Sequence, residues 1–140
     1  MTNAIEIGET IKNTITQNQD MVDEVGEKIY AVIAPLSATY PLLVYTRESI
    51  TNGANTKDGF YGDYVTFRVD VLDKKYTPCC KLANKVRHLF EKRHIDGLGI
   101  ELHDTRMAAI AESYDGDAYI TQVRFTTFVT DKPEENSQNG

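Results

Sequence analysis

The sequence YVTFRVDVL at residues 64–72 and the sequence TPCCKLANKVRHLFE at residues 77–91 together decide the fold. In the first, Val and Phe alternate with polar residues, a period of two that predicts a strand with one buried and one solvated face. In the second, apolar residues recur three and four positions apart, which predicts an amphipathic helix. Thr77 is expected to cap this helix and Pro78 to occupy its first helical position. This strand and helix predict a helix lying across a sheet.

The remaining elements are placed by the same periodicities. A stripe spaced by three and four residues, Ile5, Gly8, Ile11 and Ile15, predicts a helix at 4–18, and residues 21–25 are interpreted as a last turn ended by Gly26. Further strands are expected at 28–34, 42–50, 98–113 and 118–130. The run MAAIAE at 107–112 is compatible with a helix, but a hairpin signal directly after it, YDGD at 114–117, favours a strand.

These elements follow one another in the order α-β-β-β-α-β-β. They predict an α+β fold, a mostly antiparallel five-stranded sheet with two helices packed on one face. Residues 1–130 are expected to form a single domain. Residues 131–140 contain almost no apolar side chain and are predicted to be a flexible acidic tail.

Composition excludes several classes of protein. A chain of 140 residues that is 41% hydrophobic matches one globular domain, and its apolar runs are too short to cross a bilayer. The net charge of −6 disfavours binding to nucleic acid or to anionic lipid. The two cysteines, Cys79 and Cys80, are adjacent and cannot form a disulfide framework, which indicates the reducing cytoplasm.

The sequence predicts no catalytic, cofactor-binding or metal-binding residues. Neither GxxxxGK nor GxGxxG occurs, so no phosphate-binding loop is expected. His88, His94 and His103 lack the spacing of zinc ligands. One alternative stays open: a small enzyme or ligand-binding domain that uses Glu101, Glu112 and Asp115 around a pocket.

The loop at 51–63 is the segment most expected to make contacts with other molecules. It is about a dozen residues long, whereas hairpin loops usually have two to five, and long loops are more often functional. The residues predicted to form a protein interface there are Asn52, Asn55, Lys57, Asp58, Phe60 and Tyr61.

Four features resemble one known family. They are the proline-led strand YPLLVY at 40–45, the alternating strand at 65–72, the Leu-, Ala- and Val-lined helix, and the Tyr114-Asp115 turn before the last strand. In this order they resemble the tail-completion, or tail-terminator, proteins of long-tailed bacteriophages and prophages. The resemblance covers about residues 20–130.

The resemblance implies a non-enzymatic protein that assembles as a hexameric ring of identical copies at the end of the tail tube. Such a ring stops polymerisation of the tail tube protein and forms the surface that meets the head–tail connector protein. DNA would pass through its channel without specific binding. The expected location is the virion tail, and the host cytoplasm during assembly. A head–tail joining (neck) protein of the same ring type is the closest alternative.

Overall fold

The computed structural model describes residues 2–53 and 61–133. Residues 134–140, most of the predicted flexible tail, lie outside the described part of the chain. The elements, in chain order, are the 3-10 helix η1 (Ala4–Glu6), α1 (Ile7–Thr16), α2 (Gln19–Val25), β1 (Ile29–Ala31), β2 (Leu42–Asn52), β3 (Asp63–Asp73), α3 (Tyr76–Phe90), β4 (His94–Asp96), β5 (Ile100–Tyr114) and β6 (Tyr119–Asp131).

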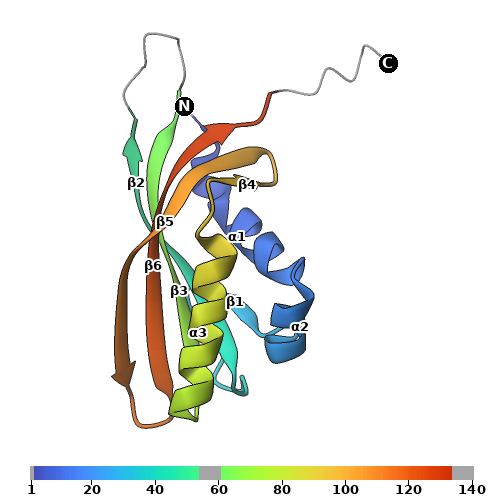
Figure 1. Ribbon diagram of the computed structural model, residues 1–140, viewed down its shortest axis with the longest axis vertical. Coiled ribbons are helices and arrows are strands. Elements are labelled where there is room, and N and C mark those ends of the chain that lie inside the picture. The colour runs from blue at the N-terminus through green and yellow to red at the C-terminus, as the bar shows by residue number, and fades with distance from the viewer. Residues whose placement is uncertain (1, 54–60, 134–140) are drawn as a thin grey trace.

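The strands form one six-stranded sheet in the order β1-β2-β3-β6-β5-β4. All neighbouring pairs are antiparallel except β1 and β2, which are parallel. Four long strands, β2, β3, β6 and β5, run the height of the molecule (Figure 1). The predicted α+β class and mostly antiparallel sheet are therefore confirmed.

The prediction of five strands is wrong by one. The missing strand, β4, has three residues, of which only Ile95 is buried. A segment this short shows no period of two, so a sequence pattern does not reveal it. The parallel direction of β1 was also missed, because residue alternation says nothing about which way neighbouring strands run.

The helices lie on one face of the sheet, as predicted, but they are more numerous than two (Figure 1). The expected helix at 4–18 ends early, and α2 is a separate helix that starts after Asn18. The side chain of Asn18 accepts a hydrogen bond from the Met21 backbone N–H, 3.1 Å away, and so caps α2. Gly26 ends α2 at a φ of 59°, in agreement with its expected role.

Helix α3 begins two residues before the predicted first helical position, Pro78, so its predicted cap is wrong. The N-cap position is Lys75, which makes no side-chain capping bond, and Thr77 lies inside the first turn. The carboxylate of Asp73 accepts a hydrogen bond from the Lys75 N–H at 3.2 Å, a turn that starts the helix before Thr77. Pro78 is still in the first turn, where its missing N–H has no helical partner to lose.

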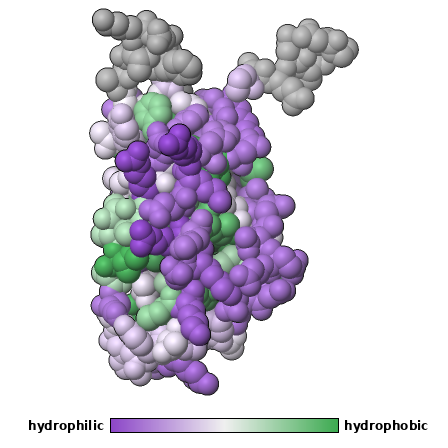
Figure 2. Space-filling view, in the orientation of Figure 1, coloured by the Kyte–Doolittle hydropathy of each residue, from purple (hydrophilic) through white to green (hydrophobic). Residues whose placement is uncertain are grey.

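Between the helices and the sheet lies the hydrophobic core. Its centre is a cluster of three fully buried rings, with centroid distances of 5.5 Å for Phe67–Phe90, 5.2 Å for Phe67–Phe125 and 5.4 Å for Phe90–Phe125. The α3 surface that faces away from the sheet is largely hydrophilic (Figure 2). Among the described residues, no helix combines the length and the apolar character needed to cross a bilayer.

The β5–β6 hairpin confirms the extended interpretation of residues 107–112. Ala109 and Ile110 pair with Arg124 and Val123 of β6. In the connecting turn, Gly116 has a φ of 98°, and the carboxylate at position 115 accepts a hydrogen bond from the N–H of residue 117 at 3.2 Å. The YDGD sequence therefore makes the turn it predicted.

Candidate assembly surfaces

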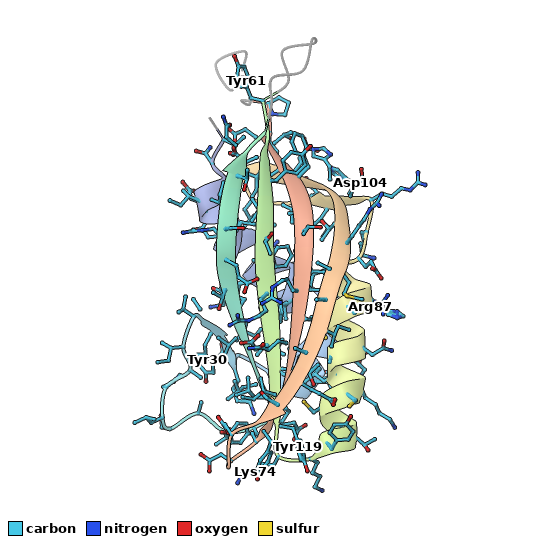
Figure 3. The ribbon with its side chains drawn as sticks, turned by 90° about the vertical axis from the view of Figure 1, so that its left-hand side faces the viewer. Tyr30, Tyr61, Lys74, Arg87, Asp104 and Tyr119 are labelled. Atoms are coloured by element: carbon cyan, nitrogen blue, oxygen red, sulfur yellow. The ribbon has the colours of Figure 1, made fainter. Side chains whose placement is uncertain are left out.

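The face of the sheet opposite the helices is open to solvent (Figure 3). It is formed by the side chains that alternate with the core residues of β2, β3, β6 and β5. Because paired residues share a face, the register places Thr46, Arg68 and Arg124 together on it. The open face is thus predominantly polar along its centre.

A network of four charged side chains crosses this open face. The Arg68 guanidinium donates to both oxygens of Asp70, at 2.7 and 3.2 Å, and to Glu48 at 3.0 Å. Arg124 donates to the two oxygens of Glu48 at 2.5 and 2.8 Å. The network ties together β2, β3 and β6, and bidentate geometry makes its contacts stronger than those of single ion pairs.

Two carboxyl groups of this network have pKa values shifted in opposite directions. Hydrogen bonding from Arg124 holds the pKa of Glu48 below its usual value, against a smaller effect of burial. Burial raises the pKa of Asp70, although Arg68 and Arg124 oppose the shift. Asp70 is therefore the carboxylate of the network whose charge is less well stabilised.

One edge of the sheet, along β5, is unpaired over half its length. Strand β4 covers only residues 101–103, and backbone hydrogen bonds donated by residues 104–105 to the segment before β4 extend this cover. The Glu91 carboxylate then accepts from the Met107 N–H at 3.3 Å. From residue 108 to residue 114, β5 has β6 on one side and, among the described residues, no strand on the other.

This open stretch of β5 is apolar at its start. Residues 108–111, Ala-Ala-Ile-Ala, are all exposed, and Ile110 retains 47% of its accessible surface. A hydrophobic patch appears on the left of the molecule in Figure 2, where the lower half of β5 lies in Figure 1. Edge strands are usually protected by charge, proline or a cover, because an unprotected edge pairs with other chains. We call residues 108–114 the β5 edge.

The opposite edge of the sheet carries a second apolar patch, next to β1. Val32 has a φ of 66°, in the left-handed region that β-branched residues rarely adopt, and its side chain is 69% exposed. Ile5, Ile33 and Leu36 are also exposed. The backbone here turns apolar side chains toward solvent at a local conformational cost, which is typical of functional positions.

Beside this patch lies an open groove of about 430 Å³. The Arg47 guanidinium, which forms part of its wall, donates to the Ile5 carbonyl oxygen at 2.6 Å. Burial, followed by the nearby Glu9 carboxylate, raises the pKa of the Tyr45 phenol in the same wall. The groove is lined by Ile5, Glu6, Glu9, Val32, Tyr45 and Arg47.

The predicted loop interface begins at a tightly closed hairpin base. The Gly53 N–H donates to the Gly62 carbonyl oxygen at 2.9 Å, and the rings of Tyr64 and Phe128 pack with centroids 5.0 Å apart. Of the predicted interface residues, Asn52 and Tyr61 are exposed, whereas Asn55, Lys57, Asp58 and Phe60 lie outside the described residues. The interface role of the loop therefore stays a prediction.

The carboxylates considered for an enzyme site do not converge. Glu101 and Glu112 lie on β5, eleven residues apart in sequence, which is roughly 35 Å along a strand. Glu101 contacts His94 at 2.7 Å, and Glu112 accepts from the Tyr76 hydroxyl at 2.7 Å. Asp115 holds the hairpin turn. The structure thus gives each of these acids a separate local partner.

The histidines and cysteines are also placed apart from any common site. The rings of His94 and His103 are 5.5 Å apart, but within the described ranges no three His, Cys, Asp or Glu residues are arranged to hold a metal ion. Cys79 is buried, and its Sγ donates to the Val71 carbonyl oxygen at 3.4 Å. Burial raises the pKa of the Cys79 thiol, which favours the unreactive protonated form.

Sequence reasoning identified neither the β5 edge nor the groove beside β1. The uncharged run at 107–111 was a signal for the first, since a solvent-exposed strand normally carries charges. No sequence pattern predicts the groove, because residues from η1, α1, β1 and β2 meet there only in the folded chain.

Among known proteins, the similarity found is one of fold. No family model matches the chain, and no curated protein matches it. Among solved structures, a chain from the "Virion of native gene transfer agent (GTA) particle" superimposes with a TM-score of 0.67 at 10% identity. The protein shares its fold with a virion component. The match covers 86% of this chain and 92% of the virion chain, so the similarity extends over most of the architecture and is not limited to one motif.

Proposed function

We propose that this protein is a structural component of a phage-type virion and that it acts as the tail terminator. The observation that carries the proposal is the shared fold with a virion chain over 92% of that chain's length. The sequence resemblance to tail-completion proteins points to the same kind of particle. The two lines of argument are independent, since one uses local motifs and the other uses the backbone.

In this proposal, identical copies form a ring at the end of the tail tube. A ring requires two different surfaces on each copy, so that each copy contacts its neighbours in head-to-tail fashion. The β5 edge and the patch beside β1 lie at opposite edges of the sheet, which suits such an arrangement. Six copies are the number that the family resemblance implies.

The ring would contact the tail tube protein on one side and the head–tail connector protein on the other. The loop at 51–63, which includes Asn52 and Tyr61, joins one end of the long strands β2 and β3 and is proposed to make one of these contacts. DNA would traverse the channel. The net charge of −6 supports passage without adhesion, because like charges repel the phosphate backbone.

We also propose that the protein works by contact and not by catalysis. The dispersed positions of Glu101, Glu112 and Asp115 support this, because acid–base catalysis needs groups within reach of one substrate. Assembly of such a protein would be driven by the burial of apolar edges such as residues 108–111.

Deletion of the gene tests the proposal in cells that carry it. Electron microscopy of the released particles should show headless tails of unregulated length, and expression of the chain from a plasmid should restore normal particles. Tails of normal length without heads would instead indicate a neck protein. Complete, infectious or DNA-transferring particles in the deletion strain would contradict both roles.

A further inference from the structure

We propose that adjacent copies pair the β5 edge of one with the outer edge of β2 of the next, and that Ile110 enters the groove beside β1. The contact is made by two copies of this chain and extends the sheet from copy to copy. This inference deepens the proposed function, and it rests on that function for the expectation that copies form a ring.

Both edges offer unpaired backbone groups, and an antiparallel contact that sets Ile110 opposite the groove residue Arg47 pairs residues 108–111 of one copy with residues 46–49 of the next. Strand β1 pairs with β2 only from Leu43 to Tyr45, so residues 46–52 have β3 on one side and no strand on the other among the described residues. Both edges present a row of backbone N–H and C=O groups, and pairing residues 108–111 with residues 46–49 satisfies the groups there.

Within each copy, Ile110 lies on the same side of the sheet as the groove, and the pairs Ile110–Val123, Val123–Val69 and Val69–Tyr45 place it level with the groove residue Tyr45. Ile110 pairs with Val123, a core residue, so its side chain points to the helix-covered side of the sheet. The groove is on the same side, because Tyr45 and Arg47 pair with core residues of β3. When one sheet continues into the next, these two features therefore meet in one layer.

The helices that flank the two edges differ in charge. Helix α3, which packs mainly over β6 and β3 and also contacts β5, contains no acidic residue, and its Arg87 projects into solvent (Figure 3). Two of its cations already have partners in the same copy: Arg87 contacts Glu91 at 3.1 Å, and Lys85 contacts Asp20 at 3.2 Å and Glu24 at 3.6 Å. By contrast, η1 and α1 place Glu6 and Glu9 in the wall of the groove.

A head-to-tail contact brings these unlike helices together. When the β5 edge of one copy meets the outer edge of β2 of the next, α3 of the first copy lies toward η1 and α1 of the second. A helix without acidic residues then approaches Glu6 and Glu9, whereas a like-to-like contact of two β2 edges would bring acids against acids. Such complementarity favours contact between the two different edges over contact between identical ones.

The backbone of Val32 is an independent observation for the same surface. A valine with a φ of 66° is strained, and here the strain directs an apolar side chain into solvent at the rim of the groove. A neighbouring copy with residues 108–111 against that rim would cover it. In this contact, Val32 of one copy packs against residues 108–111 of the next.

A cross-linking experiment distinguishes this contact from a symmetric one. Two variants, Val32→Cys and Ile110→Cys, are made in a Cys80→Ser background, which removes the less buried native thiol. They are treated with a short bismaleimide, separately and mixed, in purified concentrated protein and in particles from cells that co-express them. The mixture should give covalent dimers, and each variant alone should give about five-fold fewer, because a heterologous contact joins two different surfaces.

Two results would overturn the inference: no dimers in the mixture in either setting, or equal dimers with one variant alone, which means a like-to-like contact. Absence of the chain from the particles would instead contradict the proposed function. The two failures are therefore distinguishable.

A charge placed on the β5 edge gives a second readout. Ile110→Lys should abolish incorporation of the chain into particles, because a lysine cannot enter the apolar groove without losing its hydration. The matched control is Leu98→Lys, at a position with 52% exposure in the β4–β5 turn, which should be incorporated as wild type. Circular dichroism checks that both variants fold. Wild-type incorporation of Ile110→Lys would contradict the proposed contact.

Discussion

Glu48 and Arg124, which are 76 residues apart in the sequence, meet on the open face of the sheet through two hydrogen bonds of 2.5 and 2.8 Å. Glu48 occupies a bulge in β2, between Arg47 and Ser49, where one extra residue re-aims the side chain. The same carboxylate also accepts from Arg68 on β3. The side chain of a single bulged residue thus links three strands, β2, β3 and β6.

Substituting Glu48→Gln should lower the free energy of unfolding at neutral pH. It should also make this free energy decrease less as the pH is lowered. Hydrogen bonding from Arg124 lowers the folded-state pKa of Glu48, so its contribution is present above the unfolded-state pKa and is lost as pH falls through the folded-state value. We expect a loss of about 1 kcal/mol in the free energy of unfolding at neutral pH, since the group is partly exposed. Urea titrations of the variant and the wild type at pH 7 and at acidic pH measure this loss.

The control for this prediction is Glu27→Gln, which changes an exposed carboxylate outside the network. It should leave the free energy of unfolding and its pH dependence unchanged. The difference between Glu48→Gln and wild type should shrink as the pH is lowered. A difference that grows in acid would contradict the assigned role of the ion pair.

The three-ring cluster predicts a large effect in the core. Phe125 is fully buried and packs against both Phe67 and Phe90, at centroid distances of 5.2 and 5.4 Å. Phe125→Ala should cost about 3–5 kcal/mol of unfolding free energy, because it removes buried apolar surface and leaves a cavity. Thr126→Ala, the exposed neighbour on the open face, should change it little. Chemical denaturation of both variants tests this, and equal effects would contradict the assigned core.

A glycine at the hairpin base fits against an aromatic ring. A Cβ on Gly62 would overlap the Phe128 ring, so Gly62→Ala should displace the ring and destabilise the protein by about 1–3 kcal/mol. In the double variant Gly62→Ala/Phe128→Ala this clash is absent, so the two costs should be less than additive. Thermal or urea unfolding of the four proteins measures the coupling. Strict additivity would mean that the ring does not limit residue 62.

The loop interface has its own test. Replacing residues 54–61 with the dipeptide Asn-Gly leaves a two-residue turn between Gly53 and Gly62, which should keep their hydrogen bond and the β2–β3 register. The shortened chain should fold with wild-type stability but should fail to restore normal tails in the deletion strain. The control, Asp117→Asn, changes the hairpin at the other end of the long strands and should restore them. Normal tails with the shortened loop would remove the loop from the proposed interface.

Long, regular periodicities in the sequence were sufficient to predict the main elements. The alternation at 64–72 and the apolar stripe of α3 each persist over several repeats of the pattern, and both elements lie within one or two residues of their predicted bounds. Short elements carry no such signal. Strand β4 has a single buried residue, Ile95, so its pairing with β5 depends on tertiary contacts that a local pattern does not contain.

The candidate surfaces were harder to predict for a different reason. The apolar residues Ile5 and Val32 belong to separate segments, and only the packing of α1 against β2 brings them to one groove. Ile110 has the sequence context of an ordinary strand residue until the sheet order shows that β5 is an edge there. Exposure at an edge is a property of topology, which residue spacing does not encode.

Immunogold electron microscopy of purified particles, with an antibody against this chain, tests the central claim most directly. The account predicts label at one site in each particle, where the tail meets the head, and about six copies of the chain per particle by quantitative mass spectrometry, the number that the family resemblance implies for a closed ring. Label distributed along the tail or over the head, or particles that lack the chain altogether, would contradict it.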